Sequence, residues 1–286
     1  CNNTCTFCIV PSVRGPEVSR RPGDVISEVE RLAAEGGVEV TLLGQNVDTY
    51  GRDLAIGGRR RPIFADLLRQ VGAVEGIRRV RFTSPHPADF RREVALAMAE
   101  TEAVCEQLHL PLQSGSDRIR ARMHRGYNRQ RFMDRLAMAR EIIPDLTVTT
   151  DVIVGFPGET DEDFEMTMEV IEEARFDSAF MFIFSPRPGT AAAEMTDQFV
   201  DPEVVQERFQ RLVETQNRIS AERNAEWVGR TVEVLSEGPS KKDPSVATTR
   251  TRGGKVVHVP GEYAPGTFLD VELTEAYQHH LVGRPV

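Results

Sequence analysis

Short apolar runs alternate with longer amphipathic segments between residues 38 and 183, and this alternation restricts the possible folds more than any other feature of the sequence. The apolar runs cover residues 38–43, 80–83, 108–112, 146–154 and 179–184. The amphipathic segments cover residues 24–35, 63–74, 89–100, 129–143 and 160–174. Short buried runs separated by helix-length segments are typical of parallel β/α architectures. We therefore predict an α/β fold with a parallel sheet.

A polar or Gly/Pro-rich turn follows each apolar run. These turns cover residues 44–46, 84–87, 113–116, 155–158 and 185–189. In β/α barrels the loops that follow the strands build the active site. We therefore expect the chemistry of this chain in these turns.

The C-terminal part of the chain has a different pattern. A long polar helix is expected over about residues 202–227, followed by short β-rich runs at 231–235, 248–252, 255–259 and 268–273. From residue 228 onward seven basic residues balance seven acidic ones, so residues 1–227 carry the whole net charge of -9. We predict two units: residues 1–227 with the connecting helix, and residues 228–286 as a small antiparallel β-barrel.

The overall charge of -9 argues against a protein that coats nucleic acid without specificity, although local basic patches remain possible binding sites. No stretch reaches the roughly 18 apolar residues that a membrane helix needs, and no secretory leader opens the chain. We expect a cytoplasmic protein. Because the sequence begins at a cysteine rather than at a methionine, we also expect it to be a fragment whose upstream part is missing.

Three of the four cysteines lie within eight residues, as Cys1, Cys5 and Cys8, with the spacing C-x3-C-x2-C. An odd, clustered set fits disulfide pairing badly. A four-iron cluster is commonly held by cysteine thiolates, and three ligands would leave one iron open to a cofactor. The alternative is a zinc site that uses these thiols with a histidine or Cys105, although no second ligand pair follows nearby.

These cysteines, with Phe7 before the last of them, belong to a longer set of segments that resembles a known family. The segments are residues 5–15, 19–22, 43–47, 109–116, 123–127, 151–160 and 184–190. Together they resemble the radical S-adenosylmethionine (SAM) methylthiotransferases. Residues 44–47 and 82–87 are most similar to the branch that adds a methylthio group to isopentenyl-modified adenosine beside the tRNA anticodon. Residues 238–242, 251–257 and 281–283 resemble a TRAM module, a small RNA-binding β-barrel.

The resemblance implies a fold, cofactors and site residues. The fold is a partial parallel (β/α)6 radical SAM barrel followed by a TRAM-like antiparallel barrel. Cys1, Cys5 and Cys8 would hold a 4Fe-4S cluster with one open iron, on which S-adenosylmethionine binds and yields a 5'-deoxyadenosyl radical. No catalytic residue beyond these ligands is implied, and the residues expected to contact the cofactor are Phe7, Gln45, Gln113, Ser114, Ile153 and Gly155.

The family also implies partners that lie outside this chain. A second 4Fe-4S cluster, the expected sulfur source, belongs to an N-terminal domain that precedes Cys1 in the family. An electron donor such as flavodoxin or ferredoxin would reduce the cluster. We expect the chain to be a monomer that binds the anticodon arm of tRNA.

For the RNA substrate, residues 118–135 carry seven arginines and a single acid. Arginine pairs with phosphate and stacks on bases, so this stretch is a candidate tRNA backbone patch, with a solvated helix face as the alternative. In the TRAM-like tail we expect Arg250, Arg252 and Lys255 to join the RNA-binding turns, and Arg59, Arg60 and Arg61 form a further basic group. The residues proposed for substrate contact are Arg118, Arg122, Arg125, Arg187, Lys241 and Lys242.

The remaining titratable residues have no assigned chemistry. His86, His109 and His124 have no partner at a useful spacing, so we interpret them as structural or RNA-facing, and Cys105 as a buried small hydrophobe. Two alternatives to the main hypothesis stay open. One is a methylthiotransferase for threonylcarbamoyladenosine or a ribosomal-protein aspartate, and the other is a zinc-stabilised RNA-binding protein without catalysis.

Overall fold

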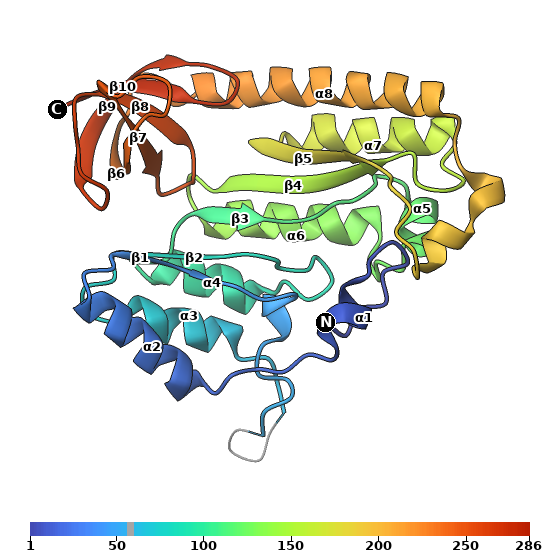
Figure 1. Cartoon of the computed structure of the whole chain (residues 1–286), viewed down its shortest axis with the longest axis horizontal. Helices are drawn as coiled ribbons and strands as arrows, with labels where there is room; N and C mark the ends of the chain where they lie inside the picture. Colours follow the sequence, from blue (N-terminus) through green and yellow to red (C-terminus); the bar gives the residue numbers. More distant parts are fainter. Residues whose placement is uncertain (56–59) are drawn as a thin grey trace.

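The computed structural model describes residues 1–55 and 60–286, and the part that precedes the C-terminal barrel forms an α/β unit (Figure 1). Arg59 of the basic triplet lies outside the described residues. Each of the five expected apolar runs contains or overlaps a strand. The strands are β1 (Glu39–Leu42), β2 (Arg79–Phe82), β3 (Gln107–His109), β4 (Thr147–Val154) and β5 (Ser178–Ile183). The helices are α1 (Val10–Arg14), α2 (Pro22–Ala34), α3 (Phe64–Gly72), α4 (Arg92–Glu100), α5 (Asp117–Arg122), α6 (Arg129–Ile142), α7 (Asp161–Ala174) and α8 (Pro202–Ala225), with short 3-10 turns at Val47–Thr49, Ala191–Glu194 and Thr196–Gln198.

All strand pairs in the α/β unit are parallel, as predicted. β1 pairs with β2, while β3, β4 and β5 form a second sheet. A single parallel bridge between Val80 and Val104 links the two sheets. The described residues thus form five strands of the expected partial barrel, with β1 and β5 as its two outer strands.

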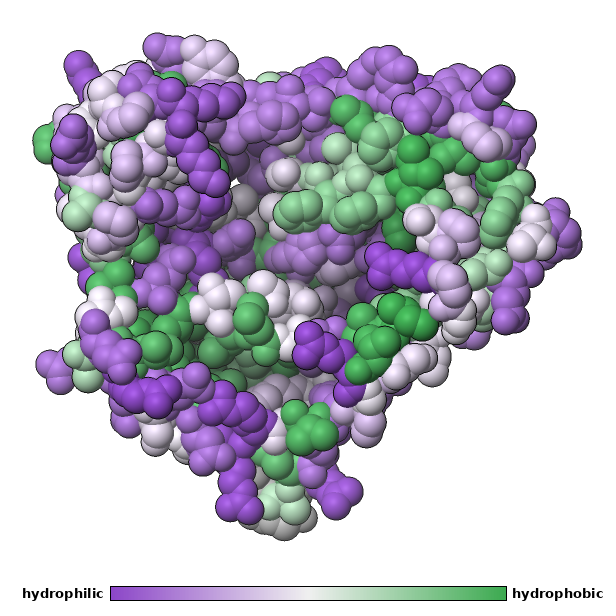
Figure 2. Space-filling view, in the orientation of Figure 1, coloured by the Kyte–Doolittle hydropathy of each residue, from purple (hydrophilic) through white to green (hydrophobic). Residues whose placement is uncertain are grey.

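The alternation of burial along β4 separates an inner face from a helix-covered face. Val148, Val152 and Val154 are buried in the main apolar core, whereas Asp151 and Ile153 are only half-buried. Because successive side chains of a strand point to opposite faces, Asp151 and Ile153 lie on the open, concave side. Figure 2 shows a hollow on the face of the molecule that lies between β1 and β5 in Figure 1.

The C-terminal unit is a closed barrel in the strand order β10-β8-β7-β6-β9. Its strands are β6 (Thr231–Pro239), β7 (Val246–Thr251), β8 (Val256–Pro260), β9 (Phe268–Ala276) and β10 (Leu281–Pro285). The predicted antiparallel pairing is found in every pair except β8–β10, which is parallel. Five strands cannot alternate in direction around a closed ring, so at least one pair must be parallel. The sequence pattern had indicated only the first four of these strands.

The turn between β7 and β8 docks against the amino-terminal ends of the α/β strands. Arg79 and Arg81 of β2 donate to backbone carbonyls of residues 250–252 at 2.7 and 2.6 Å. A Cβ built on Gly253 would lie 2.2 Å from Thr147 Oγ1, so only glycine permits this close approach. The barrel is therefore firmly attached at the end of the sheet opposite to the expected site.

This docking corrects the expectation of RNA contact for Arg252 and Lys255, whereas RNA contact by Arg250 stays a prediction. Arg252 is paired with Glu106 at 2.8 Å, and the buried Lys255 is paired with Asp177 at 2.8 Å. Arg250 pairs with a barrel glutamate at 2.7 Å. Arg252 and Lys255 join the two units because their partners lie across the interface, whereas the side chain of Arg250 is paired within the barrel.

In the part of the chain that the structure describes, no helix is long and apolar enough to cross a membrane.

Candidate functional site

The cysteine loop precedes α1 and is held at its centre by hydrogen bonds to distant segments. Thr6 donates from its backbone N to Met123 O at 3.2 Å and from its hydroxyl to Arg122 O at 2.9 Å. Its own carbonyl accepts from the N–H of Ala192 at 2.9 Å. These bonds fix the loop against the segment after α5, so the thiols on either side of Thr6 project from an ordered backbone.

Phe7 connects the same loop to the ends of β4 and β5. Together with Ile153 and Phe184 it packs against a small apolar cluster that consists of Ile119, Met123, Phe156 and Ala192. The structure therefore brings two of the expected cofactor residues, Phe7 and Ile153, to one place. This place is the carboxyl-terminal edge of the strands, where the turns were expected to carry the chemistry.

The three thiols of the loop have the donor chemistry that a 4Fe-4S cluster requires. Cys1, Cys5 and Cys8 are free and half-buried, and Cys5 Sγ accepts a hydrogen bond from Arg125 Nη1 at 3.3 Å. Among the described residues, no three His, Cys, Asp or Glu side chains are grouped to hold a single metal ion. A cluster, by contrast, takes its thiolates on separate irons. Three free thiols in one short loop are the ligand type of such clusters, so the donor chemistry of these residues fits a cluster.

The turn after β3 places Gln113 beside β4. Gln113 has a left-handed backbone with φ +65°, and its backbone exchanges hydrogen bonds with Asp151 O at 2.7 Å and Ile153 N at 2.9 Å. Ser114 is completely buried, and its hydroxyl lies 3.4 Å from Thr167 Oγ1 of α7. The Ser114 side chain thus packs against α7 and does not reach the concave face, contrary to its expected role at the cofactor.

Gly155 is buried, and its conformation is explained by packing against α8. Its φ is +75°, and a Cβ at this position would lie 2.6 Å from a methyl group of Val205. Its N–H donates to Glu159 Oε2 at 2.9 Å. The glycine is therefore required for helix packing, whatever its relation to a cofactor.

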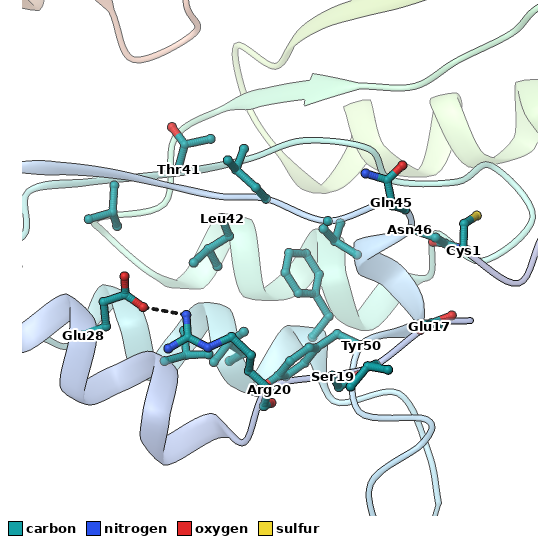
Figure 3. A pocket seen from close by; sticks show the side chains of 18 of the residues that line it. Cys1, Glu17, Ser19, Arg20, Glu28, Thr41, Leu42, Gln45, Asn46 and Tyr50 are labelled. Atoms are coloured by element: carbon teal, nitrogen blue, oxygen red, sulfur yellow. Dashed lines mark hydrogen bonds and ion pairs between the residues drawn. The ribbon is translucent and has the colours of Figure 1, made fainter. Parts of the chain in front are cut away.

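Gln45 is exposed at one end of a cavity of about 590 Å³ between β1, α2 and residues 16–20. Cys1 lies at the same end, and the ion pair between Arg20 and Glu28 lies toward the other (Figure 3). The cavity thus begins beside the cysteine loop but extends away from Phe7 and Ile153. Gln45 follows β1 and Gln113 follows β3, so both lie at the carboxyl-terminal edge of the strands but after different strands.

A buried polar group that the sequence did not reveal lies after β1 and β2. Asp48 Oδ2 accepts a hydrogen bond from the backbone N–H of His86 at 2.7 Å, and the Asn46 side-chain amide donates to Asp89 Oδ2 at 2.9 Å. Within the described residues, Asn46 Oδ1, Asp48 Oδ1 and His86 Nε2 are buried without a hydrogen-bond partner. Burial raises the pKa of Asp48 to about 8 and lowers the pKa of His86 to about 4. No sequence spacing connects these residues, because they meet only when the two strand ends lie together.

We expect the Asp48→Asn variant to remove a pH dependence of stability. Because the folded chain keeps the Asp48 proton up to about pH 8, whereas the unfolded chain releases it near pH 4, the wild type loses stability as pH rises through this window. Because each pKa unit of difference is worth about 1.4 kcal/mol, the variant should gain up to about 5 kcal/mol over the wild type at pH 8 relative to pH 4. Urea unfolding at both pH values measures this difference, and parallel pH profiles would contradict the assignment.

His109 has a partner on the concave face that the sequence spacing did not reveal. Its Nε2 lies 3.3 Å from Asp151 Oδ2, and its Nδ1 lies 2.9 Å from Thr149 Oγ1. Its ring meets Phe180 of β5 edge-on, with a centroid distance of 5.8 Å. The partners lie on neighbouring strands, so only strand pairing reveals them.

The arginine-rich stretch is largely paired within the protein. Arg118 forms an ion pair with Asp163 and donates to Gly158 O at 2.6 Å, and Arg122 donates to Gln198. Side chains that are held in this way are not free phosphate ligands. A tRNA backbone patch in this stretch would have to compete with these intramolecular partners, and it stays a prediction for Arg118 and Arg122.

Arg125 differs most from its expected role. It is 7% exposed and contacts Cys5, so it cannot face an RNA backbone. Arg187 is exposed in the loop after β5, where the sequence had placed it. Of the four arginines expected at the substrate, only Arg187 is both exposed and without an ion pair among the described residues.

The two lysines expected at the substrate are exposed in the loop between β6 and β7. Lys241 and Lys242 line a cavity of about 690 Å³ together with His258 and His280. Two lysine ammonium groups and two imidazole rings thus line the same cavity of the barrel.

Comparisons with known proteins follow the same division of the chain. The family model described as the radical SAM superfamily matches residues 1–171, and the TRAM domain model matches residues 226–286. A protein from Saccharopolyspora erythraea named tRNA-2-methylthio-N(6)-dimethylallyladenosine synthase is 54% identical over 99% of this chain and 58% of its own length. A protein of the same name from Thermobifida fusca is 54% identical with the same coverage. The chain thus spans 58% of the length of these curated relatives.

Solved structures support the fold of the α/β unit. A radical S-adenosylmethionine methyltransferase from Kitasatospora setae matches with a TM-score of 0.54 and 16% identity, over 68% of this chain and 37% of its own. Methylornithine synthase matches with a TM-score of 0.50 and 17% identity, over 76% of this chain and 60% of its own. At these identities the similarity concerns the fold alone.

Proposed function

The chain belongs to the radical SAM superfamily, and from this membership we propose that it is the cluster-binding and RNA-binding part of a tRNA methylthiotransferase. The substrate we propose is isopentenyl-modified adenosine beside the anticodon. The identity of 54% over 99% of the chain with proteins named for this modification supports the proposal most directly. The division at residues 227 and 228, with the enzyme core before it and the RNA-binding barrel after it, is part of the proposal.

We assign the cluster to Cys1, Cys5 and Cys8, whose loop is anchored through Thr6. A 4Fe-4S cluster held by these thiols would supply an electron for the reductive cleavage of S-adenosylmethionine. Phe7 and Ile153 form the apolar wall beside the loop, where they would orient the cofactor and exclude water. Gln113, at the same strand edge, offers an amide for a polar group of the cofactor.

The rest of the reaction requires components beyond the residues of this chain. Insertion of sulfur needs a sulfur source, which we assign to a second 4Fe-4S cluster in the part of the relatives that this chain does not span. A one-electron donor of the flavodoxin or ferredoxin class would reduce the cluster. We place the protein in the cytoplasm, because the substrate that we propose is tRNA. We also propose that it acts as a monomer.

Metal analysis of the anaerobically reconstituted protein tests this assignment. About four iron and four sulfide per chain, with release of deoxyadenosine from S-adenosylmethionine under reducing conditions, would support it. A colourless protein that contains zinc instead would reject the radical mechanism and favour a zinc-stabilised RNA-binding protein.

We propose that the barrel contacts tRNA through Lys241 and Lys242 and the rings beside them. The rings of Tyr277 and His280 are stacked at 4.7 Å, and His258 lies 4.9 Å from His280. Lysines bind phosphate and aromatic or imidazole rings stack on unpaired bases, so this face has the chemistry of a single-stranded RNA site.

Replacing Lys241 and Lys242 together with glutamine is expected to weaken binding of an anticodon stem-loop roughly 10-fold, because two phosphate contacts are lost. The slope of log affinity against log salt should fall by about 1 to 2 for the same reason. Fluorescence anisotropy at several salt concentrations measures both effects. Arg284→Gln is the matched control, since Arg284 is exposed on the same barrel but paired with Glu272. Equal losses in the two proteins would contradict this site.

A further inference from the structure

A buried arginine lies against the central cysteine of the loop. Arg125 Nη1 donates to Cys5 Sγ at 3.3 Å, although the two residues are 120 positions apart. Arg125 is only 7% exposed. A cation in this environment is weakly screened by solvent, so it acts strongly on the charge of the sulfur.

The chain directs this side chain inward by an unusual turn after α5. His124 has a φ of +55° and Gly126 a φ of +69°, so left-handed residues flank Arg125 on both sides. A left-handed conformation is costly for histidine and persists only where the surroundings impose it. The carbonyls of Arg122 and Met123, in the same turn, accept the two hydrogen bonds from Thr6. One turn thus positions both the backbone of the cysteine loop and the cation beside Cys5.

Tyr127 fixes the position of the guanidinium group. Its hydroxyl donates to Pro111 O at 2.7 Å and accepts from Arg125 Nε at 3.4 Å. The guanidinium carbon lies 5.5 Å from the centre of the Tyr127 ring, within the range of a cation–π contact. Tyr127 therefore holds the guanidinium group through Nε, while Nη1 of the same group donates to Cys5 Sγ.

The charge of Arg125 is not neutralised by a carboxylate. Within the described residues, no Asp or Glu oxygen lies within 4 Å of it, whereas Arg118, Arg120 and Arg129 in the same stretch all have acidic partners. Cys5 Sγ, which would be a thiolate as a ligand of the cluster, is then positioned to be the anionic partner of this buried cation. Its position agrees with a role at the cysteine loop rather than in stabilising the fold through an ion pair.

We propose that Arg125 raises the reduction potential of the cluster held by Cys5 and so favours its reduced state. This inference rests on the proposed function. A one-electron donor transfers a single electron, no bond is made or broken, and the cluster with its thiolates gains one negative charge. The positive charge and the N–H bond of Arg125 stabilise that added charge, because hydrogen bonds to the sulfurs and net charge set the potentials of such clusters.

Two variants of Arg125 test the inference by measurements other than activity. Arg125→Gln removes the charge, and Arg125→Lys keeps it on a side chain without the planar fork. In a redox titration followed by electron paramagnetic resonance, the Gln variant should show a lower midpoint potential. We expect the ratio of reduced to oxidised cluster at fixed ambient potential to fall about ten-fold, which corresponds to about 59 mV for one electron. The Lys variant should lie between this value and the wild type.

Arg131→Gln serves as the charge-matched control. Arg131 is exposed on α6 and donates to Ala88 O at 2.6 Å. Its replacement removes the same charge as Arg125→Gln, but at a position that is open to solvent. Its midpoint should equal that of the wild type. Full iron content with an unchanged midpoint in both Arg125 variants would overturn the inference.

The outcomes separate this inference from the proposed function. If the wild-type protein assembles no four-iron cluster, the proposed function itself fails. If only the Arg125→Gln variant loses its cluster, the midpoint potential of the Arg125→Lys variant decides. A midpoint below that of the wild type supports the inference, and a midpoint equal to it rejects the inference.

Discussion

Cys5→Ala is expected to lose its cluster and to lower the release of deoxyadenosine from S-adenosylmethionine by more than about 100-fold. Even changes in the residues that support metal ligands cost 10- to 100-fold in affinity or activity, and this variant removes a ligand. Cys5 is also the thiol fixed by Arg125, at 3.3 Å. Iron and sulfide content, the visible spectrum and deoxyadenosine release measure the effect.

Cys105→Ala is the matched control for this experiment. Cys105 is 1% exposed and packs before β3, so its replacement removes one buried sulfur without touching the loop. A destabilisation of about 1 kcal/mol is expected, with iron content and cofactor cleavage retained. A Cys5→Ala protein that keeps its full iron and sulfide would show that the cluster is held elsewhere.

Lys255→Met is expected to destabilise the folded chain by about 3 to 5 kcal/mol, the range for removing one partner of a buried ion pair. Lys255 Nζ donates to Asp177 at 2.8 Å and to Asn224 at 2.9 Å. Burial lowers the pKa of Lys255, and the Asp177 carboxylate opposes that shift. Without the ammonium group, the Asp177 carboxylate stays buried, and among the described residues Arg223, at 3.6 Å, is then its only charged partner.

Urea unfolding followed by fluorescence measures this loss at the interface itself. Trp227 is the single tryptophan of the chain, and its ring centre lies 5.6 Å from Lys255 Nζ. Lys241→Met removes an exposed lysine of the same barrel and should change stability by less than about 0.5 kcal/mol. Adding Asp177→Asn to Lys255→Met should restore part of the loss, because the unpaired charge is then removed. Equal midpoints for the two single variants would contradict a structural role for the pair.

The sequence was most informative where the information is local. Each strand of the α/β unit lies in or overlaps an apolar run, and the thiols of one short loop indicated the cluster chemistry by themselves. The strand that was missed, β10 (Leu281–Pro285), contains both glycine and proline, which resemble a turn in any local pattern. Its pairing with β8 and β9 decides its structure.

The roles of the arginines were beyond the reach of sequence patterns. A run of like charges looks like a solvated or RNA-facing surface, yet Arg118 pairs with Asp163, which is 45 positions away. Lys255 and Asp177 are 78 positions apart. Nothing in the spacing of charges predicts such partners.

The sequence by itself therefore determined the β/α succession, the barrel-forming tail and the three-thiol loop proposed to hold the cluster, because periodicity and short spacings act within one element or one loop. Only the tertiary structure decided which charges are free. It placed Arg125 on Cys5, His109 beside Asp151 and Lys255 at the interface, since a buried charge takes whichever partner the packed chain brings within reach.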